Sequence, residues 1–145
     1  MDQTEFWDDY QHLKREVNVL RDSVQRLNII RGRFQALMDS PGAFVAFFDS
    51  EGRFLEINLG GLALLGLNAT EVIDQHHVRV LQDEPSRSIG AKASEAIRSK
   101  QAVPFVWKLT SNDGIAHTLN ATATPVRDER GTVVAACVVA VPQSS

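Results

Sequence analysis

The sequence predicts an α+β protein in which a long N-terminal helix precedes a domain built on an antiparallel sheet. Over residues 6–38 apolar side chains recur at alternating steps of four and three residues, which is helical spacing. Five short strand-like segments follow, separated by turns that contain glycine. Helical segments lie only between the second and third strands, an order that favours an antiparallel sheet. The 145 residues fit one such domain plus the helix. We place the helix at 1–39 and the domain at 40–145.

The N-terminal repeat is typical of a parallel, two-stranded coiled coil. Val17 and Val24 fall at a positions and leucines at the inner d positions, the combination that favours two parallel strands. The flanking charges agree, as in Glu16 opposite Arg21 of a second chain. Arg31 breaks the seam, either because its stem extends out to solvent or because it marks a weak point before the domain. We therefore expect a homodimer with the interface residues Tyr10, Leu13, Val17, Leu20, Val24, Leu27 and Phe34.

The elements of the domain follow from turn and cap residues. The helix should end at 40–42, where Pro41 disfavours helical geometry in its predecessor. Strands at 43–48 and 53–57, joined by a Gly-containing turn, predict a hairpin. A short helix follows at 58–65, and Asn68 with Glu71 predicts a capping box that starts another. The segment 76–85 has no clear pattern. A longer helix is expected at 86–100, and strands at 103–110, 115–124 and 132–141.

Composition excludes several classes of protein. The net charge of −3 provides no basic surface, so we expect no nucleic-acid partner. No apolar run is long enough to span a bilayer and no signal peptide precedes the acidic start, so we expect a cytoplasmic protein without a membrane partner. A single cysteine, Cys137, forms neither an internal disulfide nor a cysteine metal cage.

Several short motifs occur together and in order. They are Asp49-x-x-Gly52, Ile57-Asn58, Leu64-Leu65-Gly66-Leu67-Asn68-x-x-Glu71-Val72-Ile73, Asp113-Gly114 and Pro125-Val126-Arg127-Asp128-x-x-Gly131. In this order the chain resembles a PAS domain over about 34–141. The resemblance implies a five-stranded antiparallel sheet cupped by short helices around an interior pocket. It also implies a sensory or dimerising role, transmitted through helices that flank the domain.

Within that family the second half is most similar to the flavin-binding light-oxygen-voltage group, through the run Arg79-Val80-Leu81-Gln82. The resemblance places Val78 where that group has its photoactive cysteine. It places Leu109 and Leu119 at the two flavin-contacting asparagines, and Ala140 at the glutamine. Since each unpaired polar group of a buried flavin costs about 1–3 kcal/mol, we expect no flavin photochemistry and no resident cofactor.

Alternation along the last three strands places one set of side chains toward the interior. They belong to Phe105, Trp107, Leu109, His117, Leu119, Ala121, Ala123, Val134, Ala136, Val138 and Ala140. Two interpretations stay open, an apolar pocket for a small hydrophobic ligand and a core filled by its own bulky side chains. Our candidate lining residues are Val78, Trp107, Leu109, His117, Leu119 and Ala140.

The histidines give no convincing metal or haem site. His76 and His77 lie upstream of the helix that usually supplies the axial ligand in haem-binding PAS domains, and adjacent histidines are not a spaced chelating pair. His117 is expected at the rim of the sheet. The last strand is also apolar on its other face, at Val133, Ala135, Cys137 and Val139, so that face needs a cover such as Ile29, Ile30 or Leu37 from this chain or a partner.

No catalytic motif is present, so we expect no enzyme activity. The sequence favours a dimeric PAS module for signal transduction, coupled to a parallel coiled coil and acting on an effector protein that the sequence does not identify. The alternatives are a pure dimerisation adaptor and a flavin- or haem-binding sensor. The chain ends soon after its last strand, without the helical connector that usually leads to an effector.

Overall fold

The structure is a computed structural model that describes residues 8–18, 20–21, 35–36, 38–39 and 42–143. The chain divides into two units, Met1–Ala36 and Leu37–Ser145. In the first unit residues 8–18 and 20–21 are helical, as the apolar repeat predicts. A coiled coil needs a second chain, so that part of the expectation stays a prediction. Among the described residues no helix is long and apolar enough to cross a membrane.

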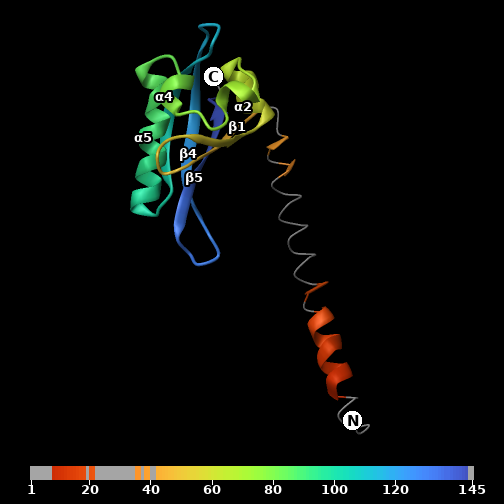
Figure 1. The fold of residues 1–145 in the computed structure, drawn as a ribbon. Coiled ribbons are helices and arrows are strands. Elements are labelled where there is room, and N and C mark those ends of the chain that lie inside the picture. The colour runs from red at the N-terminus through yellow and green to blue at the C-terminus, as the bar shows by residue number, and fades with distance from the viewer. Residues whose placement is uncertain (1–7, 19, 22–34, 37, 40–41, 144–145) are drawn as a thin grey trace. The chain divides into compact units, whose positions relative to one another are not determined.

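The second unit is built on one antiparallel sheet with the strand order β2-β1-β5-β4-β3 (Figure 1). The five predicted strands are all present, with ends that differ by a few residues. They are β1 (Phe44–Phe48), β2 (Phe54–Ile57), β3 (Val103–Thr110), β4 (Ala116–Arg127) and β5 (Val133–Pro142). β1 and β2 pair as the predicted hairpin, and β5 lies in the middle of the sheet between β1 and β4. This is the arrangement that the PAS resemblance implies.

Four helices connect β2 to β3. They are α2 (Leu59–Leu65), α3 (Ala69–Val72), α4 (His77–Val80) and α5 (Glu84–Ser99). Asn68 and Glu71 form the predicted capping box of α3. The long helix starts two residues earlier than expected, because Asp83 caps it and Pro85 lies in its first turn. The segment without a clear pattern contains α4, a single turn capped by His76.

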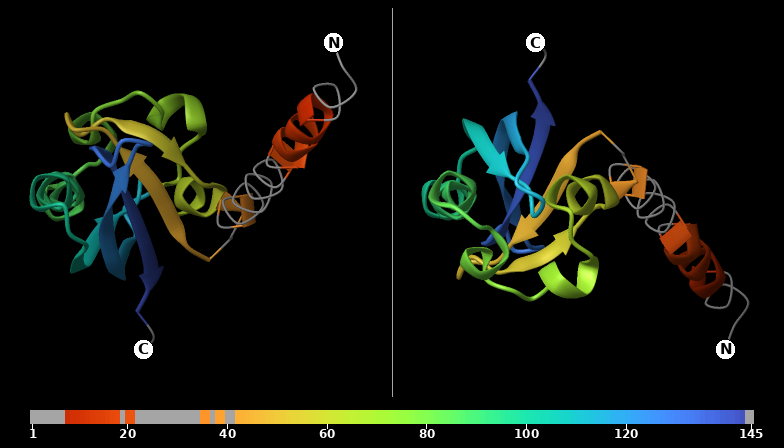
Figure 2. Two further views of the ribbon diagram at one scale, coloured as in Figure 1. Left: turned by 90° about the horizontal axis from the view of Figure 1, so that it is seen from below. Right: turned by 90° about the horizontal axis from the view of Figure 1, so that it is seen from above.

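α5 packs on β3, β4 and β5 and lies along one side of the sheet (Figure 2). Ile89, Ala93 and Ala96 of this helix are buried against the inner face, as the helical spacing predicts. Inner side chains of all five strands complete the same core. Because alternate residues of a strand point to opposite faces, β1 contributes Phe44 to this core and Val45 to the other face.

The expectation for Val134 is wrong. Its side chain is 48% exposed, whereas Ala136, Val138 and Ala140 of the same strand are buried in the core. The register of β4 against β5 shifts between Val126 and Arg127, and that end of the hairpin extends beyond the residues that pair with β1 and β3. Val134 therefore lies past the part of the sheet that the helices cover.

Candidate functional site

The interior between the sheet and α5 is filled by large side chains. Trp107, Phe44 and Leu119 are fully buried there, and the rings of Phe44 and Trp107 meet edge to face with centroids 4.7 Å apart. The indole Nε1–H of Trp107 donates a hydrogen bond to the carbonyl of Ser86, 2.8 Å away, so its polar atom is satisfied without water. The bulky residue at the centre of the predicted pocket thus forms part of the core.

The first turn of α5 fixes this arrangement. The Ser86 hydroxyl accepts a hydrogen bond from the backbone amide of Thr110 at 2.8 Å, which ties the helix to the end of β3. Asp83 accepts the Ser86 amide at 2.9 Å. Hydrogen bonds from Ser86 first, and then from Thr110, lower the pKa of the Asp83 carboxyl. The indole of Trp107 is therefore held against a helix start that is itself anchored to the neighbouring strand.

The structure brings four of the six candidate lining residues together. Trp107, Leu109, Leu119 and Ala140 lie in the core cluster, each no more than 1% exposed. His117 is half-buried opposite Leu109 near the end of the sheet, at the rim position expected for it. Val78 lies on α4, 45% exposed, and lines surface hollows instead of the interior.

These positions do not fit a flavin. At the places where the light-oxygen-voltage group uses asparagine and glutamine, this chain has the buried hydrocarbon side chains of Leu109, Leu119 and Ala140. Polar groups of a flavin ring in this interior would have no partners among these side chains. Val78 also has no thiol to form an adduct. The residues present therefore provide no basis for flavin chemistry.

The apolar stripe of the N-terminal helix is exposed in the single chain. Tyr10, Leu13, Val17 and Leu20 are 49%, 58%, 44% and 64% exposed. Glu16, which the coiled-coil interpretation pairs with Arg21 of a second chain, lies 3.0 Å from His12 one turn earlier in its own helix. The remaining predicted interface residues, Val24, Leu27 and Phe34, lie outside the described residues.

The outer face of the sheet carries a second, smaller apolar cluster. Met38, Ala43 and Val45 are buried there, and Cys137 and Val139 of β5 pack against them, as the apolar outer face of that strand predicts. Burial raises the pKa of the Cys137 thiol to about 11. The suggested covers Ile29, Ile30 and Leu37 lie outside the described part of the chain.

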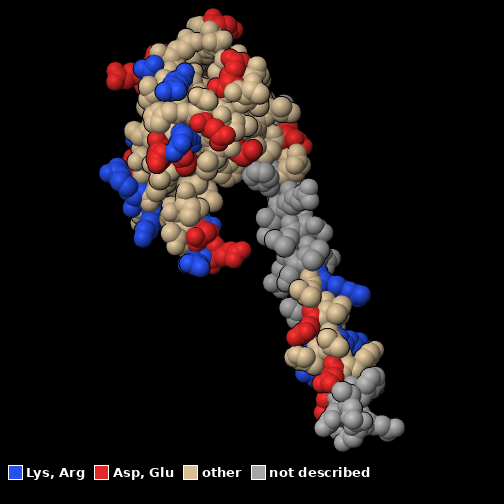
Figure 3. All heavy atoms as spheres, in the orientation of Figure 1, with Lys and Arg blue, Asp and Glu red and all other residues tan. Residues whose placement is uncertain are grey.

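Next to this cluster the outer face is hollowed. A depression of about 610 Å³ lies over β3, β4 and β5. Its lining includes the exposed side chains of Val106 and Val141 together with Thr122 and Val139. On the face of the domain that Figure 3 shows, Lys and Arg side chains are interspersed with Asp and Glu. The outer face of the sheet therefore carries an apolar surface that the described residues leave uncovered.

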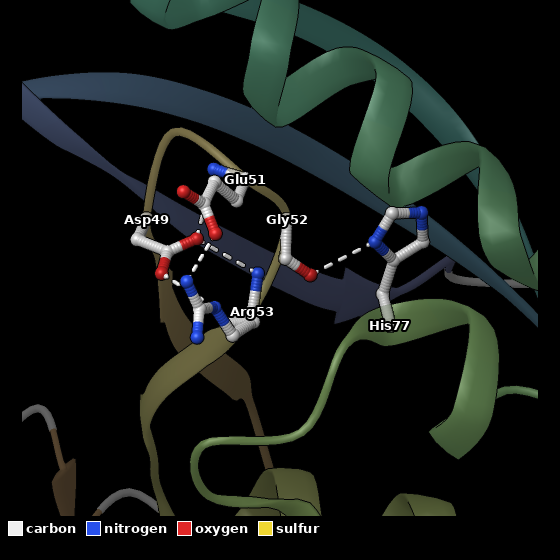
Figure 4. A network of polar contacts seen from close by, with 5 residues as sticks. All are labelled: Asp49, Glu51, Gly52, Arg53 and His77. Atoms are coloured by element: carbon white, nitrogen blue, oxygen red, sulfur yellow. Dashed lines mark hydrogen bonds and ion pairs between the residues drawn. The ribbon is translucent and has the colours of Figure 1, made fainter.

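The sequence did not predict a set of polar contacts at the turn between β1 and β2. His77 of α4 reaches the turn between the strands, where its Nδ1 lies 2.9 Å from the carbonyl oxygen of Gly52 (Figure 4). Arg53 in the same turn binds the carboxylates of Asp49 and Glu51. The two histidines weighed for haem thus lie at this surface junction. A glycine inside α5, Gly90, was the available signal, because a glycine in a helix often marks a close approach.

The hairpin-first sheet, the small helices and the single long helix define a PAS-type domain. The chain matches the PAS fold family over residues 38–143 and belongs to it. Domains of this family are typically sensory or signal-transduction modules. No curated protein is similar enough in sequence to count as a relative.

Solved structures show the same fold at low identity. The PAS domain of a Colwellia psychrerythraea protein has a TM-score of 0.66 at 19% identity, covering 79% of this chain and 97% of that one. The Vibrio cholerae VqmA dimer, described as a DNA-binding LuxR-type receptor, has a TM-score of 0.65 at 19% identity, covering 78% of this chain and 52% of that one. An RNA-binding light-oxygen-voltage receptor has a TM-score of 0.62 at 19% identity, covering 79% and 33%. The chain thus spans about half the length of VqmA.

Proposed function

We propose that this protein is a dimeric PAS module for signal transduction, whose N-terminal helix forms a parallel coiled coil and carries the state of the domain to an effector protein. The observation that carries the proposal is the exposed apolar stripe of the described helix, from Tyr10 to Leu20. In water an isolated helix with such a stripe gains little from its own hydrogen bonds, and burial against a second copy stabilises it. The proposal includes no catalytic step and places the protein in the cytoplasm.

The outer face of the sheet supports a second contact in the same dimer. Val106 and Val141 are exposed beside a broad hollow, and an apolar surface of this kind marks an interaction site. Met38 already covers the neighbouring part of this face at β1 and β5. We propose that an apolar helical segment of this chain or its copy covers the remainder.

A cysteine cross-link tests both the dimer and its direction. Leu20→Cys in a Cys137→Ala background places one thiol at a d position, where two parallel helices bring equivalent residues together. We expect rapid oxidation to a covalent dimer. The matched control is Arg15→Cys, at the outward f position, which should stay monomeric on a non-reducing gel. Equal cross-linking of the two variants, or a monomer by sedimentation equilibrium of the unmodified protein, would refute the parallel dimer.

An adaptor without a ligand is the second candidate, and the filled interior favours it. Trp107 and its neighbours occupy the space in which a small molecule would lie. Native mass spectrometry distinguishes the two functions, since a stoichiometric small molecule supports sensing and a bare protein supports the adaptor. An absorbance scan of the same sample tests the flavin and haem alternatives, both of which predict a visible band.

A further inference from the structure

The ring of His77 lies between two glycines from different elements. On one side is Gly52 in the β1–β2 turn, with φ +86°, where an added Cβ would lie 2.7 Å from the ring nitrogen Nδ1. On the other side is Gly90 in α5, where an added Cβ would lie 2.1 Å from Nε2. While His77 keeps this place, a side chain at either position would overlap its ring. The imidazole therefore fills a fitted space between the hairpin turn and the long helix.

The hydrogen bonds at this place fix which nitrogen of the neutral ring carries the hydrogen. The Gly52 carbonyl oxygen accepts twice from the same residue, from the His77 backbone amide at 3.0 Å and from its Nδ1 at 2.9 Å. A carbonyl oxygen is an acceptor only, so Nδ1 carries the hydrogen, and in neutral His77 the nitrogen Nε2 has none. A second proton would have to occupy Nε2, on the side that contacts α5 at Gly90.

The charges around the ring oppose that second proton. The imidazole of His76 stacks on it with centroids 4.3 Å apart, and Arg87 approaches from α5, where its Nε donates to the Leu81 carbonyl. The carboxylates of the turn, Asp49 and Glu51, are held by Arg53. Arg79 is the remaining cation of α4. Burial first, and then the charges of His76 and Arg87, lower the pKa of His77, against the opposite effect of the Gly52 hydrogen bond.

We infer that His77, with His76 stacked on it, is a pH-sensitive latch that holds the β1–β2 turn to α4 and α5 when neutral and releases it when protonated. All the residues belong to the domain itself, so the inference does not depend on the dimer. The sign follows from linkage. The folded form prefers the neutral ring, so the latch contributes its full stability above the unfolded pKa of 6.5 and loses it as the pH falls through the lowered folded pKa.

Histidine NMR titration of the full chain tests the latch. We expect the ring protons of His77 to titrate with a midpoint below 6.5, and the amide resonances of residues 51–54 to shift with the same midpoint. In His77→Gln the transition of these amides at the His77 midpoint should disappear, whereas the matched control His117→Gln, on β4, should keep it. A His77 midpoint at or above 6.5, or a transition at the same midpoint that survives in His77→Gln, would overturn the inference.

Two further variants separate the geometry from the titration. His76→Gln removes the neighbouring positive charge, so the midpoint of His77 should move up toward 6.5. Gly90→Ala changes no titratable group but places a methyl where the ring lies, so His77 should leave its place and titrate near 6.5. An unchanged His77 midpoint in either variant would contradict the latch.

Discussion

Asn58 is the position at which a single substitution should be most informative about the stability of the domain. It is 1% exposed, and its Oδ1 accepts from the amides of Val45 at 2.9 Å and Gly61 at 2.7 Å. Its Nδ2 donates to the carbonyl of Ala43 at 2.9 Å. One side chain therefore caps α2 and holds the start of β1. We predict that Asn58→Ala is strongly destabilising.

The magnitude follows from the groups left behind. The Val45 and Gly61 amides and the Ala43 carbonyl would lose partners in a buried region, at about 1–3 kcal/mol each. Allowing for some relaxation and entry of water, we expect a loss of about 3–5 kcal/mol in the free energy of unfolding. Since domains of this size are stable by about 5–15 kcal/mol, the variant should still fold.

The chain contains a matched control. Asn68 is also an asparagine N-cap, of α3, but it is exposed, and its Oδ1 accepts from the Glu71 amide at 3.1 Å. Water can replace that bond, so Asn68→Ala should cost about 1 kcal/mol. Urea denaturation followed by circular dichroism measures both variants. If Asn58→Ala costs no more than Asn68→Ala, the reasoning from burial is refuted.

The isosteric variant Asn58→Asp adds a pH test. It keeps the two accepting bonds but turns an oxygen toward the carbonyl of Ala43, so the buried carboxyl favours its protonated form and its folded pKa is raised. A group with a raised folded pKa stabilises the protein below its unfolded pKa and loses that effect as the pH rises through the folded value. The variant should therefore approach the unmodified protein in stability only under acid conditions.

Three further predictions concern the core, the outer face and the start of α5. Trp107→Ala should lower the free energy of unfolding by about 3–5 kcal/mol. Added indole should fill the resulting cavity and restore part of the lost melting temperature in a thermal-shift assay. No recovery would contradict a core filled by this ring. The Cys137 thiol, with its pKa raised to about 11, should react with iodoacetamide far more slowly in the native than in the urea-unfolded protein, and equal rates by mass spectrometry would contradict its burial. Because the pKa of Asp83 is lowered in the folded protein, its stabilising effect is present at neutral pH and is lost as the pH falls through the folded pKa. Asp83→Asn should therefore make the urea midpoint depend less on pH under acid conditions. An unchanged pH dependence would contradict this role.

Local rules predicted most of the sheet. The strands have alternating patterns bounded by turn residues, and the hairpin of β1 and β2, the capping box at Asn68 and the buried face of α5 all occur where these rules place them. Alternation failed at Val134, because the register shift against β4 and the overhanging end of the hairpin are set by pairing between distant segments. Alternation along a strand predicts which face of the sheet a side chain points to. It does not predict where the helices stop covering that face.

Local rules predicted less of the interior and of the His77 contacts. Sequence identified the side chains that face the interior, yet whether they enclose a space or fill it depends on how Phe44 and Trp107 meet across the sheet. The fitted place of His77 depends on Gly52 and Gly90, which lie 25 and 13 residues away in the chain. In the sequence, the glycines are the only sign of such a close contact. Each glycine can also be explained by its own turn or helix, so the contact could not be predicted from them.

β1 has side chains in both the core and the outer cluster of the sheet, as β5 does. Its inner side chains, Phe44 among them, pack with Trp107, while Val45 on the other face packs with Met38. The strand is held at its start by Asn58 and ends at the turn that His77 contacts. A filled interior transmits a displacement better than an empty one, because close-packed side chains have little room to absorb it. Because β1 has contacts on both faces of the sheet and at both of its ends, the filling of the described interior by side chains does not argue against a signalling role.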